Sequence, residues 1–119
     1  MARESVSLEP ITPALLDEVR DAIVRAIAPD RIILFGSAAR AGEGAPHDID
    51  LYVIKRGVTD RRATERQIEQ LFLGRRFALD VLLSTPDQVE QSLKAGNSFL
   101  VQEVFGRGRV LYERAAHSA

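Results

Sequence analysis

A glycine–serine pair and two alternating aspartates stand at the ends of two apolar segments. Gly36–Ser37 follows the apolar run 31–35, ten residues separate it from Asp48, and Asp50 precedes the run 51–54. Both runs are short and apolar and are predicted to be buried strands. A small turn and an acid-x-acid pair at neighbouring strand ends suit metal-assisted chemistry on a phosphate group.

The two aspartates are spaced to act together. Residues i and i+2 of a strand point to the same face, so Asp48 and Asp50 project together, about 7 Å apart at the backbone. Two carboxylates this close repel each other unless a cation or a proton is present. Hard oxygen ligands, in a chain without cysteine, favour magnesium or manganese over zinc. The pair therefore predicts a site for one or two divalent cations.

The turn offers groups that suit a phosphate. Gly36 has no Cβ and lets a phosphate approach the backbone. Ser37 supplies a backbone N–H and a hydroxyl, and its place predicts a short helix whose N-terminus favours anions. Arg40 is a further candidate phosphate ligand, the alternative being a solvated loop charge. Gly-Ser is also a common turn and Asp-x-Asp a possible solvated strand edge, but their combination between two apolar strands favours the functional interpretation.

A third carboxylate interrupts the apolar segment 76–83. Alternation places Leu79 and Val81 on one face of this predicted strand and Asp80 on the other. A carboxylate in such a setting needs a cation, a hydrogen-bond donor or solvent. Asp80 joins the other two acids if its strand pairs with 49–54, whereas a salt bridge to an arginine is the alternative.

Together these residues resemble the nucleotidyltransferase superfamily that includes DNA polymerase beta. The resemblance is closest to the minimal nucleotidyltransferases (MNT), often the antitoxin partners of HEPN ribonuclease toxins. It runs from the leading helix through Phe35–Ser37, Asp48–Leu51 and Asp80 to the closing segment 108–113. Three positions depart from the expected pattern: Ala38 where Arg is usual, Ala41 where Gly is usual and His47 where Ser is usual. The carboxylates are intact, so the missing arginine bears on phosphate affinity or nucleotide choice rather than on the fold.

The resemblance implies a role for each residue of the two motifs. Gly36 and Ser37 would hold the triphosphate of ATP, and Asp48 and Asp50 would bind two Mg²⁺ ions. Asp80 would complete the metal site and help activate the attacking hydroxyl. The implied reaction transfers AMP from ATP to a protein hydroxyl, a tyrosine of a HEPN-type toxin, which would make the chain a protein adenylyltransferase and an antitoxin.

Other functions fit part of the pattern. A non-catalytic nucleotide-binding antitoxin would neutralise its partner by occlusion; Ala38 favours this alternative and the three acids oppose it. Small-molecule transferases, such as aminoglycoside-modifying enzymes, carry an additional acceptor-binding domain and are disfavoured by length. In a chain of 119 residues, either a second copy completes the site as a homodimer, or a macromolecular acceptor brings its own surface.

Length and composition limit the remaining classes. The chain predicts one domain over residues 1–119, with loose termini at 1–11 and 114–119. It is 45% hydrophobic and 28% charged, as in ordinary globular proteins. Its net charge of −1 provides no global basic field, so no direct nucleic-acid binding is expected. No apolar run reaches membrane-spanning length and no signal-peptide core is present, which predicts a cytoplasmic protein without membrane contact.

The remaining sequence supplies the elements that must position these groups. Strands and helices alternate, which predicts an α/β (α+β) nucleotidyltransferase fold with a mixed sheet and helices packed on one face. The predicted strands cover residues 31–36, 49–54, 76–83 and 109–112. The predicted helices cover residues 13–27, 60–73, 86–94 and 98–105, with a short turn or helix at 37–41. The glycine-rich segment 42–47 is expected to be a mobile loop.

Capping residues mark the helix ends. Thr12 and Pro13 suit the start of the first helix, Thr59 is a plausible cap of the second, and Thr85–Gln88 forms a capping-box pattern before the third. The first helix and the 86–94 helix are expected to cover the face opposite the acids. The acid-bearing face must then stay open to ligand.

Overall fold

The computed structural model describes residues 10–40 and 48–115. Along the chain the elements are α1 (Pro13–Ile27), β1 (Arg31–Phe35), η1 (Ser37–Ala39), β2 (Asp48–Ile54), α2 (Arg61–Gln70), β3 (Ala78–Ser84), α3 (Pro86–Lys94), η2 (Phe99–Val104) and β4 (Arg109–Glu113). The predicted loop 42–47, and with it Ala41 and His47, lies outside the described residues.

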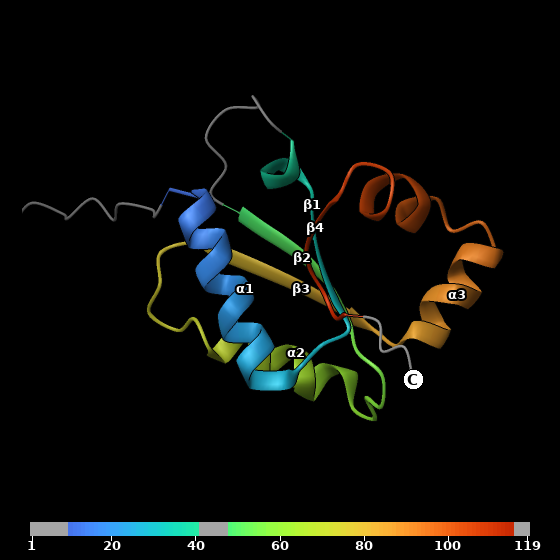
Figure 1. Ribbon diagram of the computed structural model, residues 1–119, viewed down its shortest axis with the longest axis horizontal. Helices are drawn as coiled ribbons and strands as arrows, with labels where there is room; N and C mark the ends of the chain where they lie inside the picture. The colour runs from blue at the N-terminus through green and yellow to red at the C-terminus, as the bar shows by residue number, and fades with distance from the viewer. Residues whose placement is uncertain (1–9, 41–47, 116–119) are drawn as a thin grey trace, which may run out of the picture.

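The four strands form one mixed sheet in the order β3-β2-β1-β4 (Figure 1). β1 pairs antiparallel with β2 and with β4, while β2 pairs parallel with β3. A parallel pair needs a crossover connection, and α2 lies in that connection between β2 and β3. The predicted mixed sheet and α+β class are confirmed.

One face of the sheet packs against α1 and α2. Ile23 of α1 and Ile68 of α2 are fully buried there, together with Leu34 and Leu51 of the central strands. Burying one such side chain contributes about 1.5–3 kcal/mol, so this cluster is the main source of stability for the sheet. Ile68 is the one buried residue of α2, and most of the helix is exposed.

The other face is covered over only part of its length. A second cluster joins sheet residues to α3 and η2: Ile33, Tyr52, Ile54, Val89, Leu100 and Val104. In Figure 1, α3 and η2 lie on one side of the sheet and α1 and α2 on the other. The expectation that the 86–94 helix shares the face of α1, and that helices cover one face only, is therefore wrong. The reason is that the acid-bearing face also carries apolar residues farther along its strands, and these require cover.

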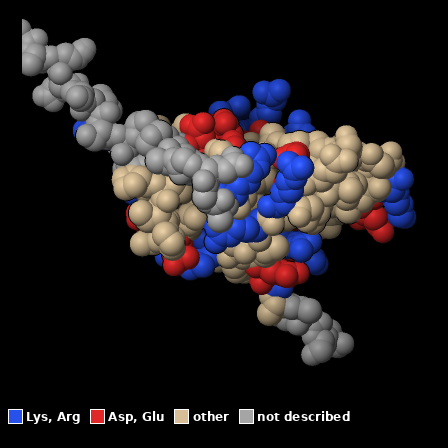
Figure 2. Space-filling model, turned by 90° about the horizontal axis from the view of Figure 1, so that it is seen from above, with Lys and Arg blue, Asp and Glu red and all other residues tan. Residues whose placement is uncertain are grey.

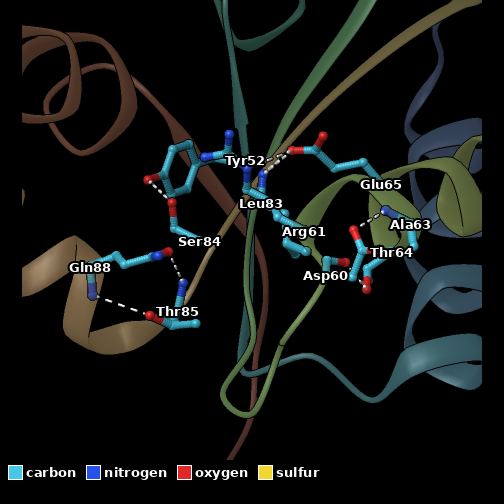
Figure 3. Close-up of polar contacts among 10 residues, drawn as sticks. All are labelled: Tyr52, Asp60, Arg61, Ala63, Thr64, Glu65, Leu83, Ser84, Thr85 and Gln88. Carbon is cyan, nitrogen blue, oxygen red and sulfur yellow. Dashed lines mark hydrogen bonds and ion pairs between the residues drawn. The ribbon is translucent and has the colours of Figure 1, made fainter.

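The starts of α1 and α3 follow the local signals. The Leu15 N–H donates to Thr12 Oγ1 at 3.1 Å at the start of α1. The capping box of α3 is formed: the Thr85 N–H donates to Gln88 Oε1 at 3.0 Å, and the Gln88 N–H donates to Thr85 Oγ1 at 3.2 Å (Figure 3). These two predictions are confirmed.

Two helices differ from their predictions. α2 is capped by Asp60 rather than Thr59, because Asp60 Oδ1 accepts from the Ala63 N–H at 3.0 Å (Figure 3). The predicted helix 98–105 is a π-helical segment, η2. Its Phe105 N–H donates to the Leu100 carbonyl at 2.9 Å, the spacing of a π turn.

The described chain ends are attached to the core. Ile11 packs against the α1 face of the sheet. The Arg114 N–H donates to the Asp30 carbonyl at 2.8 Å, so this residue extends the β4 edge rather than fraying. The rest of the predicted loose termini, 1–9 and 116–119, lies outside the described residues. Across the described residues, no helix combines the length and apolar character needed to cross a bilayer.

Candidate functional site

The sheet register brings the acids together at the uncovered end of one face. Directly paired residues point to the same face of a sheet, and Phe35, Asp50 and Asp80 are paired across β1, β2 and β3. Asp48 lies two residues before Asp50 on β2 and is paired with Ala78 of β3. The strand pairing on which the third acid depended is therefore present, and Asp80 stands beside Asp50.

Asp50 is the most enclosed of the three. It is half-buried, whereas Asp48 and Asp80 are exposed. Burial raises the pKa of the Asp50 carboxyl above its ordinary value; the charge of Asp80, a hydrogen bond with Asp80 and the charge of Asp48 raise it further. Asp48 and Asp80 therefore both act on the Asp50 carboxyl, and carboxylates this close repel one another unless a cation or a proton is present.

The donor set fits a hard divalent cation, although the side chains do not yet converge. Within residues 10–40 and 48–115, no three acidic or histidine side chains surround a common point. The strand register nevertheless places Asp80 directly opposite Asp50 on β3, and Asp48 two residues before Asp50 on β2. Exposed Asp48 can change rotamer to complete the group. Three carboxylates whose repulsion a cation would cancel are suitable ligands for Mg²⁺.

Gly36 lies directly against Asp50. Its φ of 76° is in the region that favours glycine. A Cβ built at this position would collide with Asp50 Oδ2 and come within 3.3 Å of Asp50 Cγ. Glycine is thus required here for two reasons, its backbone conformation and the approach of the carboxylate. From the sequence alone, only the approach of a phosphate was predicted.

Ser37 and Arg40 bound the short helix η1, which follows Gly36. The Arg40 N–H donates to the Ser37 carbonyl at 3.1 Å. The Arg40 Nη2 donates to Glu103 Oε1 of η2 at 3.3 Å, and Glu103 also pairs with Arg107 at 3.6 Å. A triphosphate would therefore compete with Glu103 for Arg40. This carboxylate was missed in the sequence analysis, since 63 residues separate the two partners.

A cavity lies at the opposite end of the sheet from the acids. Several of the charged side chains that line it are held in structural ion pairs. The cavity has a volume of about 680 Å³, and Asp30, Arg56 and Arg114 are among its lining residues. Asp30 accepts a 2.8 Å hydrogen bond from the Arg56 N–H and lies 3.5 Å from Arg114 Nη1. These groups compensate one another, whereas the acids at the other end do not. We therefore assign the candidate site to the acid end.

Removing the charge of Asp50 should stabilise the metal-free protein. A folded-state pKa raised above the unfolded value means that the native state binds the proton more tightly. Stability is then present at low pH and is lost as pH rises through the folded pKa. In EDTA at pH 7, Asp50→Asn should melt at a higher temperature than wild type, and the difference should shrink as pH falls.

Asp87→Asn provides a matched control, because Asp87 lies in the first turn of α3, where a negative charge favours the helix. It should give no such gain. Thermal denaturation between pH 4 and pH 8 checks both variants, and an Asp50→Asn melting point at or below wild type would contradict the electrostatic account.

Comparison with known proteins identifies related sequences and structures. Residues 18–117 match the sequence profile of the family described as Polymerase beta, Nucleotidyltransferase. No curated protein matches the chain significantly. The chain is similar to a structure of tri-AMPylated HEPN toxin from Shewanella oneidensis in complex with MNT antitoxin: 22% identity, 87% of this chain, 74% of that chain, TM-score 0.49.

Two further solved structures are similar at the same level. One is a mutant MntA–HpeT toxin–antitoxin complex, with 19% identity over 83% of this chain and 73% of that chain and a TM-score of 0.48. The other is a toxin–antitoxin complex with AMP-PNP, with 22% identity over 82% of this chain and 73% of that chain and a TM-score of 0.49.

Proposed function

Because this chain belongs to the polymerase beta nucleotidyltransferase family, we propose that it transfers AMP from ATP to a protein hydroxyl with the help of Mg²⁺. The proposed acceptor is a tyrosine of a HEPN-type ribonuclease toxin, which makes the chain an antitoxin. The observation that supports this most is the register of Asp50 with Asp80 across two parallel strands. Asp48 is two residues away and Gly36 lies against Asp50.

Each motif residue has a part in the proposed reaction. Gly36 and Ser37 hold the triphosphate near the backbone at the end of β1. Asp48 and Asp50 are the ligands of the nucleotide-bound cation, and Asp80 completes the site on the acceptor side. Bound Mg²⁺ would supply Lewis acidity that offsets the triphosphate charge and lowers the pKa of the hydroxyl.

The proposed step is a single displacement at the α-phosphorus. The acceptor oxygen bonds to the α-phosphorus, the bond to the bridging oxygen breaks, and pyrophosphate leaves. The hydroxyl proton passes to Asp80 or to solvent. Asp50 itself is half-buried, and the lower local dielectric strengthens its electrostatic interactions.

The class of partner is supported by the motifs. The chain resembles the minimal nucleotidyltransferases, whose usual partners are HEPN toxins. The resemblance lies in Phe35–Ser37, in Asp48–Leu51 and in the ten residues between these two motifs. A HEPN-type partner follows from that resemblance.

An occluding antitoxin is the second candidate function. Arg40 is held by Glu103, and Ala38 stands where an arginine is usual, so the triphosphate side of the site has fewer available cations than the motif predicts. Such a module would neutralise its partner by covering it. Its action would require neither Mg²⁺ nor transfer.

Nucleotide binding should depend on a divalent cation. Asp48 and Asp50 would repel a bare triphosphate, so calorimetry should show ATP binding with Mg²⁺ and at least about tenfold weaker binding in EDTA. A HEPN-type protein incubated with the chain and α-labelled ATP should acquire label only when Mg²⁺ is present.

The same pair of conditions separates the two candidates. Equal ATP affinity with and without Mg²⁺ would remove the metal site from the proposal. Neutralisation of the HEPN-type ribonuclease in EDTA, to the same extent as with Mg²⁺ and ATP, would favour occlusion.

A further inference from the structure

We propose that a pocket beside the acids is the acceptor subsite, and that it takes a hydroxyl-bearing aromatic side chain from an acidic segment of the acceptor protein. The pocket has a volume of about 370 Å³ and lies between β3, the start of α2 and η2. This inference rests on the proposed function, and it assigns the surface that recognises the acceptor.

The pocket continues the acid-bearing face. Tyr52 and Leu82 are paired across β2 and β3, two residues beyond the Asp50–Asp80 pair, and both line the pocket. Two residues along a strand span about 7 Å. A side chain lying over the exposed Leu82, beside the buried Tyr52, can therefore place a terminal hydroxyl near Asp80.

The inner wall is apolar and aromatic. Leu82 and Phe99 remain 42% and 39% exposed, although both are large apolar side chains. Phe99 is held edge-on against Phe35, with ring centroids 5.4 Å apart, and Phe35 is the residue paired with Asp50. Figure 2 shows an uncharged stretch of surface on the side of α3 and η2. An aromatic ring inserted here gains offset or edge-to-face contacts as well as burial.

The floor is fixed by polar contacts that leave the ring space free. The hydroxyl groups of Tyr52 and Ser84 lie 2.7 Å apart and are hydrogen-bonded, with Arg61 and Glu65 on the far side of β3 (Figure 3). Glu65 Oε2 accepts from the Leu83 N–H at 3.0 Å, which satisfies a donor on the outer edge of the sheet. This contact fixes the start of α2 beside the pocket.

The rim favours negative charge. Arg61, Arg62 and Glu65 line it, two cations against one anion. Glu65 is occupied by the Leu83 N–H and lies 4.0 Å from Arg61 Nε. Arg62, the next residue of α2 after Arg61, is exposed. Acidic residues flanking the acceptor hydroxyl would complement this rim.

The side of approach distinguishes the acceptor from the leaving pyrophosphate. In an in-line displacement the attacking and leaving oxygens lie on opposite sides of the phosphorus. The leaving pyrophosphate is assigned to the turn after β1, and Asp80 lies two strands away on β3. The acceptor therefore approaches from the β3 side, where this pocket opens.

Short peptides test the subsite directly. The probes are a fluorescein-labelled peptide with one tyrosine flanked by glutamates and a matched peptide with lysines in place of the glutamates. The wild-type chain should bind the glutamate peptide at least about tenfold more tightly, by fluorescence anisotropy. Label transfer from ATP should show the same preference in KM.

Arg62→Glu is the decisive variant. Its control is Arg66→Glu, because Arg66 lies one turn farther along α2 and does not line the pocket. Arg62→Glu should lose about tenfold in affinity for the glutamate peptide while ATP affinity stays unchanged. Phe99→Ala, checked for folding by circular dichroism, should weaken both peptides. Arg66→Glu should match wild type.

The outcomes separate this inference from the proposed function. Peptide binding that depends on Arg62 without any label transfer supports the subsite and counts against adenylyl transfer. No preference for the glutamate peptide, or equal losses in Arg62→Glu and Arg66→Glu, overturns the subsite. A fall in ATP affinity in Arg62→Glu or Phe99→Ala also overturns it, because the pocket would then hold the nucleoside.

Discussion

Asp80→Asn is expected to leave ATP binding intact and to slow AMP transfer by at least about a hundredfold, the low end for a positioned base or an activated nucleophile. Asp80 lies on the edge strand β3, in register with Asp50, and is exposed on the side proposed for the acceptor. Its removal takes away one negative charge near the triphosphate. Nucleotide affinity should therefore be equal to wild type or slightly higher.

The comparison variants are Asp48→Asn and Asp50→Asn. These residues are the proposed ligands of the nucleotide-bound cation, so each replacement should abolish both ATP binding and transfer. Calorimetry with Mg²⁺ and single-turnover labelling of the partner protein measure the two quantities separately. A wild-type labelling rate in Asp80→Asn would show that Asp80 is a structural carboxylate.

Gly36→Val is expected to reduce ATP affinity by at least about a hundredfold in a protein that still folds. The new side chain would collide with Asp50 Oδ2 and displace the carboxylate. It would also occupy the space through which a phosphate reaches the backbone of the turn. The backbone of Gly36, with φ 76° and ψ −158°, is in a region almost restricted to glycine, which adds a strain of about 1–3 kcal/mol for a residue with a Cβ.

Gly57→Val controls for a branched side chain at a positive φ. Gly57 has a φ of 78°, close to the 76° of Gly36, but a Cβ there meets nothing within 4 Å. This variant should lose stability and keep normal ATP affinity. Circular dichroism and calorimetry on both variants check the prediction. Normal ATP binding by a folded Gly36→Val would show that Gly36 serves only the turn.

Local signals in the sequence determined the secondary structure and the face of most side chains. Thr12 and Pro13 start α1, and Thr85 and Gln88 form the capping box of α3, because both signals act over a few residues. Strand alternation placed Val81 toward the core and Asp80 away from it. The motif spacing also led to the correct family, which the match over residues 18–117 confirms.

Local sequence signals did not determine the π-helical form of η2 or the Asp60 cap of α2. Competing choices one residue apart differ little in local energy, and the surrounding packing selects among them.

Tertiary structure alone decided which distant residues meet. Asp50 meets Asp80 because β2 and β3 pair in parallel. The hydrogen bond between Arg40 and Glu103 joins residues that are 63 positions apart in the chain. Alternation fixes the face of a residue, but the register between strands follows from the burial of whole faces. The same burial brought α3 and η2 onto the acid-bearing side, where they cover the apolar end and leave the carboxylates open.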